Sequence, residues 1–224
     1  DVPSFRKKHR LSLEEAAREV RYDFLARVCL EQGAHAVALG HTSDDQAETI
    51  LMHIIRGTGL TGLRGMETVT HRAFSGSEVV LVRPMLSLSR SETAHYCRVL
   101  KLEPRQDESN LSRELTRNKI RMELVPLLET YNPAIRDALV RLSRSAAQEI
   151  AYMEGEIDEI WHKTVHQDQG RVSVNREAFR PLAQALQNHL LRRVILTAKG
   201  DLKDVDQIHI NNMVRLMAGP AGRS

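Results

Sequence analysis

Apolar residues recur every three to four positions over Leu13–Val28, the spacing of one buried face of an α-helix. Ser12 and Glu15 form an S-x-x-E capping box just before this run, so we expect a helix that starts there and ends near Gly33. A continuous apolar stretch at 36–39 follows and predicts a strand buried on both faces of a parallel sheet.

A second helix is expected over 43–56, where Ser43 and Gln46 make another capping box before apolar residues at helical spacing. Residues 79–82 form a second buried-strand candidate, and Ser89 caps a helix that reaches Leu100. Helices that alternate with buried strands are typical of α/β proteins with a parallel sheet.

The pattern changes after Pro126 and the Asn132-Pro133 break and becomes helical, with helices expected at 134–165, 182–196 and 205–217. We therefore predict an α/β domain at 1–130, with a partial Rossmann-like parallel sheet, followed by an all-α substrate-binding domain at 131–224. Two parallel strands do not make a sheet that folds alone, so we expect further strands in a longer protein.

Composition narrows the class of protein. The 224 residues carry a net charge of +3 and a pI near 9.0, which permits a nucleic-acid partner without requiring one. No apolar run approaches the roughly 18 residues of a membrane span, so we expect no membrane association. Cys29 and Cys97 stand apart from other metal-ligating residues, which favours reduced thiols in the cytoplasm over zinc, an iron–sulfur cluster or disulfides.

The segment 40–49 lies where a buried strand leads into a helix, which is where ligands bind in open α/β sheets. Asp45 and Glu48 lie three residues apart on one helix face, and we expect them to converge with His41 on this crevice. No Lys or Arg is near them in the sequence, so we expect uncompensated carboxylates that attract a cation or an amine. Helix capping and the helix dipole explain Asp44 equally well, and that alternative stays open.

A glycine-rich loop follows at 57–65, and its first six residues read GxGxxG. The dinucleotide-binding fingerprint needs a strand before the glycines, whereas a helix precedes them here, so we exclude a Rossmann NAD site. We expect a mobile loop beside the crevice that closes on substrate.

A row of arginines forms the third motif. On a helix that starts near Ser112, Arg113, Arg117 and Arg121 fall on one side, an arrangement suited to clamping phosphate. A solvated helix face with Glu114 paired to Arg117 is the alternative.

At these motifs the chain resembles the tRNA(Ile)-lysidine synthases, a bacterial family within the PP-loop ATP pyrophosphatases. Four segments carry the resemblance: SLEEAAREVRYDFL, ALGHTSDDQAETILMHIIRGTGLTGLRGM, VRPMLSLSR and DESNLSRELTRNKIRMELVPLL. It is dense from Leu11 to about Ser145 and looser in the later helices. It implies an adenine nucleotide alpha hydrolase-like fold for the first domain and a tRNA-binding role for the second.

The resemblance also implies an activity. Members of the family use ATP to adenylate C2 of the wobble cytidine in the isoleucine tRNA with anticodon CAU, and L-lysine then displaces AMP. Mg²⁺ is expected with ATP, without an assigned ligand. The oligomeric state is open, with a homodimer as one alternative. The implied site residues are Asp45 and Glu48 for lysine, His41 beside ATP, Arg117 and Arg121 for phosphate, and Arg21 as a further nucleotide contact.

The chain departs from the family pattern in two respects. Thr42 occupies a position where the family usually has a second His. The SGGxDS loop, which the family places upstream of the matched region, is not in this sequence, so we expect this chain alone to bind ATP weakly and not turn it over. A PP-loop tRNA thiolase and a tRNA-binding pseudoenzyme are the alternative functions.

Overall fold

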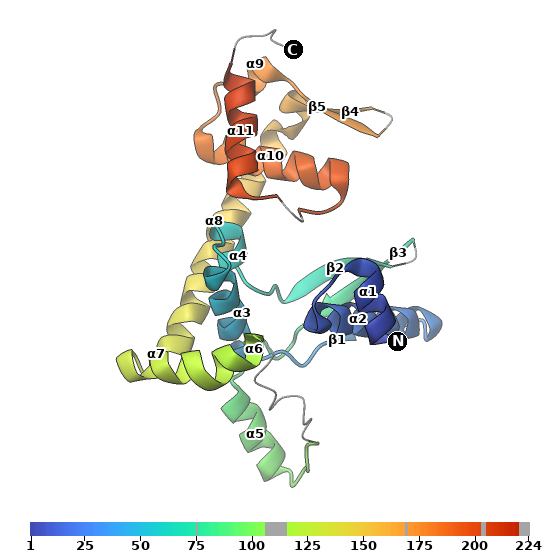
Figure 1. Cartoon of the computed structure of the whole chain (residues 1–224), viewed down its shortest axis with the longest axis vertical. Helices are drawn as coiled ribbons and strands as arrows, with labels where there is room; N and C mark the ends of the chain where they lie inside the picture. Colours follow the sequence, from blue (N-terminus) through green and yellow to red (C-terminus); the bar gives the residue numbers. More distant parts are fainter. Residues whose placement is uncertain (75, 106–115, 169, 203–204, 220–224) are drawn as a thin grey trace. The chain divides into compact units, whose positions relative to one another are not determined.

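The structure, a computed structural model, describes residues 1–74, 76–105, 116–168, 170–202 and 205–219. The chain divides into two compact units, Asp1–Arg144 and Ser145–Ser224. The division falls within a long helix, α8 (Ile135–Thr164) (Figure 1).

The first unit contains a three-stranded sheet in the order β1-β3-β2 (Figure 1). The strands are β1 (Ala36–Ala38), β2 (Val69–Phe74) and β3 (Ser77–Val82). The predicted pairing of the two apolar strands is confirmed, because β1 runs parallel to β3. The sequence pattern missed β2, which runs antiparallel to β3 and is exposed at every second residue.

The prediction that the first strand is buried on both faces is wrong. Ala36 and Val37 are half-buried and Ala38 is exposed. The reason is position, since among the described residues β1 pairs only with β3 and therefore lies at one side of the sheet.

Helices α1 (Val2–His9) and α2 (Leu13–Glu31) open the chain. The capping box predicted for α2 is present, with the Ser12 hydroxyl accepting from the Glu15 N–H at 3.2 Å. Helix α2 covers the sheet through a small core, Ala26, Cys29, Val79 and Leu81, flanked by Val37, Leu39 and Phe74.

Helix α3 (Ser43–Ile55) and the short α4 (Leu60–Leu63) follow β1. Helix α3 buries Ala47, Ile50 and Leu51 in a second core. Packing in this core fixes the position of α3, and the first turns of α3 carry the candidate acidic residues.

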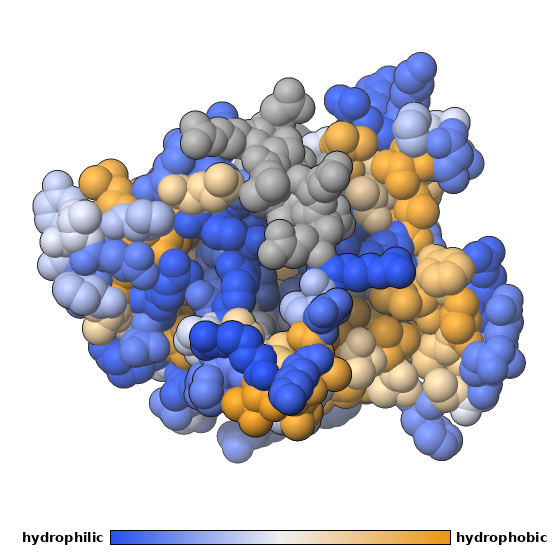
Figure 2. Space-filling view, turned by 90° about the horizontal axis from the view of Figure 1, so that it is seen from below, coloured by the Kyte–Doolittle hydropathy of each residue, from blue (hydrophilic) through white to orange (hydrophobic). Residues whose placement is uncertain are grey.

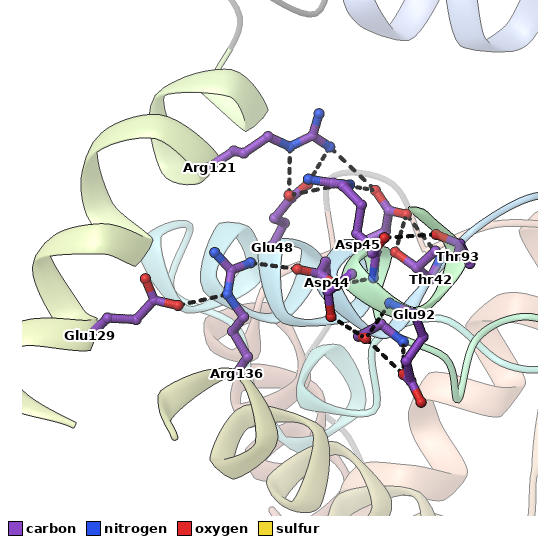
Figure 3. Close-up of polar contacts among 12 residues, drawn as sticks. Thr42, Asp44, Asp45, Glu48, Glu92, Thr93, Arg121, Glu129 and Arg136 are labelled. Carbon is purple, nitrogen blue, oxygen red and sulfur yellow. Dashed lines mark hydrogen bonds and ion pairs between the residues drawn. The ribbon is translucent and has the colours of Figure 1, made fainter. Parts of the chain in front are cut away.

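A π-helical turn, η2 (Ile120–Leu124), joins α6 (Thr116–Lys119) to α7 (Val125–Tyr131). In the turn, the Val125 N–H bonds to the Ile120 carbonyl, five residues back. Pro126 explains the distortion, because it lacks an N–H and its ring would collide with the carbonyl four residues earlier. The wider turn buries Ile120 and Val125 in the α3 core and points Arg121 toward α3 (Figure 3).

Helix α5 (Arg90–Val99) starts at the predicted Ser89 cap and buries none of its residues. Val99, Leu100 and nearby Leu102 are at least half exposed, and Figure 2 shows such hydrophobic patches between hydrophilic surfaces on the face seen from below. The N-terminal end of α5 is held to α3, with the Ser43 N–H donating to the Leu88 carbonyl at 2.8 Å. This attachment brings Arg90 to the start of α3.

The second unit contains most of α8, the helices α9 (Arg176–Phe179), α10 (Gln184–Lys199) and α11 (Gln207–Ala218), and a hairpin of β4 (Val165–Asp168) and β5 (Arg171–Val174). The three long helices were predicted. The hairpin was not predicted, and it departs from the all-α domain expected at 131–224. The core of the second unit consists of Ile157, Trp161, Val165, Phe179, Leu190, Leu191, Val194 and Ile210. Within the part of the chain that the structure describes, no helix is long and apolar enough to cross a membrane.

Candidate active site

Thr42, rather than Ser43, caps helix α3. Its backbone N–H and its hydroxyl each donate to the Asp45 carboxylate at 2.9 Å. The predicted capping box of Ser43 and Gln46 is therefore wrong, since the chain turns into the helix one residue earlier. The consequence for the site is that Asp45 is held in a fixed orientation by the cap.

The two carboxylates predicted to converge do lie together at the start of α3, but they are not uncompensated (Figure 3). Arg121 donates to Glu48 through Nε at 2.7 Å and Nη2 at 2.9 Å, and Nη2 lies 3.3 Å from Asp45. Arg90 Nη2 lies 3.3 Å from Asp45 and 3.5 Å from Glu48. The expectation that no cation lies nearby is wrong because both arginines come from distant segments.

Glu48 is fully buried, whereas the Asp45 side chain keeps 15% of its exposure. Burial acts to raise the pKa of Asp45, but hydrogen bonds from the Thr42 backbone and hydroxyl lower it. Arg90 and Arg117 lower it further, so the Asp45 carboxyl is ionised at neutral pH.

Asp44 points away from this pair and ties three helices together (Figure 3). Its carboxylate accepts from the Arg90 backbone N–H at 2.7 Å and from the Arg136 guanidinium of α8 at 2.8 Å. Arg136 in turn donates to Glu129 of α7 at 2.8 Å. Asp44 therefore links neighbouring helices in addition to its favourable interaction with the dipole of α3.

No group of three or more His, Cys, Asp or Glu side chains suited to a metal occurs among the described residues.

The arginine row is present in part. Arg117 donates to the Thr49 hydroxyl at 2.8 Å, and its Nε lies 3.8 Å from Glu48. Arg117 and Arg121 thus both contact side chains of α3, and their expected contact with phosphate stays a prediction. Arg113 lies outside the described residues.

A pocket of about 760 Å³ lies between α2, β1, α3 and the α6–η2 segment, large enough for a nucleotide. It brings together all the predicted site residues except Glu48, which is fully buried and accepts a hydrogen bond from Arg121. The predicted residues that line it are Arg21, His41, Asp45, Arg117 and Arg121.

A smaller pocket of about 210 Å³ shares Arg18, Arg21, His41 and Arg117 with the larger one and adds Arg83. Three buried nitrogen atoms at this pocket have no hydrogen-bond partner among the described residues: His41 Nδ1, Arg83 Nε and Arg117 Nε. Four guanidinium groups line the pocket, and the buried Nε atoms of Arg83 and Arg117 that lack a hydrogen-bond partner in the described chain belong to two of them, so the pocket is suited to an anion.

His41 is neutral in this setting. Desolvation lowers its pKa to about 4, and Arg83 and Arg117 lower it too, whereas Asp45 acts in the opposite direction. The ring can therefore form hydrogen bonds without adding a positive charge at neutral pH.

Gln46 fixes one wall of the smaller pocket. Its amide nitrogen donates to the carbonyls of Arg64 and Met66 and to the Ser143 hydroxyl, and its oxygen accepts from the Met66 N–H at 2.7 Å. Gly65, which lies between Arg64 and Met66 in the sequence, lines the pocket together with Met66. The end of the glycine-rich loop is therefore held against α3.

The sequence did not single out several residues that shape the site, namely Arg18, Gln46, Arg83, Arg90 and Arg136. Arg18 carried a usable signal, because it precedes Arg21 by one helical turn. Gln46 lies next to Asp45 on α3, but its spacing from Ser43 indicated only a capping role. Arg83, Arg90 and Arg136 reach the site from separate elements, and no local spacing connects them to it.

The comparisons with known proteins agree with this architecture. Residues 2–128 match the PP-loop domain family, and the chain belongs to that family. It is 42% identical over 223 residues to a tRNA(Ile)-lysidine synthase from Dehalococcoides mccartyi, which covers 99% of this chain and 47% of the relative. It is 35% identical over 218 residues to a tRNA(Ile)-lysidine synthase from Clostridioides difficile, with 96% and 46% covered.

The chain thus spans about half the length of the curated relatives that it matches. Among solved structures, a U34-tRNA thiolase from Methanococcus maripaludis with a 4Fe-4S cluster matches at a TM-score of 0.45 and 23% identity. That match covers 58% of this chain and 43% of the thiolase chain.

Proposed function

We propose that the protein is a tRNA(Ile)-lysidine synthase, an ATP-dependent carbon–nitrogen ligase. In the proposed reaction the C2 oxygen of the wobble cytidine attacks the α-phosphate of ATP, and pyrophosphate leaves. The lysine ε-amine then attacks C2, and AMP leaves with the oxygen. The tRNA is an isoleucine tRNA, as the names of the similar curated proteins suggest, and the family resemblance implies the anticodon CAU.

One observation carries the proposal: an acidic pair and an arginine-lined pocket meet at shared residues. Asp45 lines the larger pocket, and the same pocket shares His41 and Arg117 with the smaller cationic one. A carboxylate that holds an amine and guanidinium groups that hold phosphates are the two requirements for joining an amine to an adenylated base.

Each predicted residue then has a role in the proposal. Asp45 and Glu48 orient the lysine amine, and Asp45 is the more accessible of the two. Arg21, Arg117 and Arg121 contact the ATP phosphates, where their charges stabilise the negative charge that develops during transfer. His41, neutral beside the pocket, donates or accepts a hydrogen bond to the nucleotide. Mg²⁺ accompanies ATP without an assigned ligand, and the homodimer stays a prediction.

Paired rate measurements on the full-length protein test the acidic pair. We expect Asp45→Asn and Glu48→Gln each to reduce incorporation of labelled lysine about 30- to 1000-fold, the loss expected for one charge-assisted contact. Pyrophosphate release with tRNA and ATP, measured without lysine, should fall far less. Glu48→Gln removes a fully buried charge and leaves the partly buried Arg121 guanidinium without its main partner, so Asp45→Asn is the variant less prone to unfolding.

Glu31→Gln is the matched control, because Glu31 is an exposed carboxylate 3.9 Å from an equally exposed Arg27. Asp44→Asn is unsuitable as a neutral control, since Asp44 holds Arg136 and the start of α5. Near wild-type lysine incorporation by Asp45→Asn would refute the lysine assignment. Sulfur transfer to tRNA by the wild type would favour the thiolase, and tRNA binding without pyrophosphate release would favour the pseudoenzyme.

A further inference from the structure

The acidic pair is surrounded by more positive charge than it can neutralise. Among the described residues, three guanidinium groups lie within 4 Å of the two carboxylates: those of Arg90, Arg117 and Arg121. Glu48 has contacts with all three, and Asp45 has contacts with two. The pair is therefore saturated with cations when no ligand is present.

This saturation conflicts with a simple lysine site. An ammonium group that approached Asp45 would add a fourth positive charge beside two negative ones, and like charges this close repel. If the proposed function is correct, one arginine must leave its contacts before the amine can bind. The arginine that moves most easily is the one with the weakest contacts and the most exposed side chain.

Arg121 and Arg117 are poor candidates for movement. Arg121 makes two short hydrogen bonds to the fully buried Glu48, and its side chain is only 23% exposed. Arg117 is 26% exposed and is also held by the Thr49 hydroxyl at 2.8 Å. Two short bonds from one guanidinium form a strong and directional contact.

Arg90 differs from Arg117 and Arg121 both in its exposure and in the strength of its contacts. Its side chain is the most exposed of the three, at 42%, and it reaches the carboxylates through Nη2 alone at 3.3 and 3.5 Å. Its backbone is nevertheless fixed, because its N–H donates to Asp44 at 2.7 Å. The side chain can therefore swing into solvent while helix α5 stays in place.

We propose that Arg90 is a displaceable counter-ion that occupies the ammonium position of the lysine site and so sets the affinity for lysine. The proposal rests on the proposed function. Arg90 neutralises the acidic pair while the site is empty, and lysine binds by replacing it. Arg90 thereby acts against lysine binding, unlike a residue that holds the substrate.

The test compares the KM for lysine among variants of the full-length protein, in the tRNA-lysidine assay at saturating ATP and tRNA. We expect Arg90→Met to lower the KM about three- to fivefold, the gain from removing a partly exposed competing ion pair. Arg90→Lys keeps the charge and should stay closer to the wild-type value. Arg98→Met, an exposed arginine on the same helix, is the control and should match the wild type.

Each outcome decides between the two proposals. A wild type without lysine incorporation overturns the proposed function and this inference together. An active wild type with an unchanged KM in Arg90→Met overturns only the counter-ion role. An increased KM shows that Arg90 holds lysine directly, which also overturns it. If Arg90→Met fails to fold in a thermal melt, Arg90→Gln carries the same expectation with a smaller apolar change.

Discussion

Asp45 receives its hydrogen bonds from its own helix cap and its counter-charges from other helices. Thr42 fixes the carboxylate locally, and Arg90 and Arg121 reach it from α5 and η2. A residue held in this way keeps its ionised form and its direction at once, which is what an amine-binding carboxylate requires.

Burial of His41 makes the stability of the fold depend on pH. Its pKa is about 4 in the fold and 6.5 without the fold, so the unfolded chain takes up this proton first as the pH falls. The stability contributed by the neutral ring is therefore fully present above pH 6.5 and is lost between pH 6.5 and 4. Because the ring is partly solvated, we expect a loss of only about 1 kcal/mol by pH 5.

Urea unfolding at pH 7 and pH 5 measures this effect. His41→Gln should lose less stability between the two pH values than the wild type, and His35→Gln, an exposed histidine, should lose as much as the wild type. Equal losses in all three proteins would show that His41 is charged or solvated in the fold.

Residue types and spacing in the sequence predicted the acidic pair and the described arginines of the row. The sequence could not show the charge balance, because Arg90 and Arg121 lie 42 and 73 positions from Glu48. The resulting error was to treat carboxylates without cations close in sequence as uncompensated. A guanidinium at the end of a long side chain leaves no local pattern at the carboxylate that it meets.

Two glycines of the loop at 57–65 share a backbone conformation but differ in their surroundings. Gly57 and Gly65 both have positive φ, at 78° and 68°. A Cβ at Gly57 would meet no atom within 4 Å, whereas a Cβ at Gly65 would lie 2.7 Å from the Gln46 amide nitrogen. Gln46 cannot move aside without giving up several buried hydrogen bonds.

We therefore expect Gly57→Ala to reduce the free energy of unfolding by about 1 kcal/mol, the cost of the left-handed backbone alone. Gly65→Ala should cost about 1 to 2 kcal/mol more, because it also breaks the hydrogen bonds of Gln46. Denaturant unfolding of the two variants measures the difference. Equal losses would mean that Gln46 does not hold the loop.

The elements with strong local signals were predicted well. Capping boxes marked the starts of α2 and α5, and helical periodicity marked α8, α10 and α11. The strand β2 and the hairpin of β4 and β5 were missed because they are half-exposed and contain many polar residues, so they lack the continuous apolar run of β1 and β3. Such strands are stabilised by pairing with a neighbour, which a local pattern does not contain. The π-turn likewise depends on Pro126 acting within a helix whose continuation is set by packing.

We expect tRNA to bind to the whole protein chiefly through phosphates. The sequence of segment 190–224 is basic, with six Lys and Arg residues against three Asp, and several of its described charged residues have partners. Arg193 is paired with Asp158 and lies over the Trp161 ring, and Lys199 is paired with Asp201. Arg192 instead donates to the neutral Gln207 amide, so it keeps its full charge for a phosphate.

Affinity for tRNA should consequently fall steeply with salt. Release of counterions from a few phosphates predicts a loss of about tenfold or more between 50 and 200 mM salt, measured by fluorescence anisotropy with labelled tRNA. Arg192→Gln should reduce the slope of log affinity against log salt by about one phosphate contact. Arg27→Gln removes an exposed arginine already paired with Glu31 in the first unit, and its slope should equal that of the wild type. An affinity that is unchanged between the two salt concentrations would exclude phosphate contacts as the main source of binding and would point to recognition of bases instead.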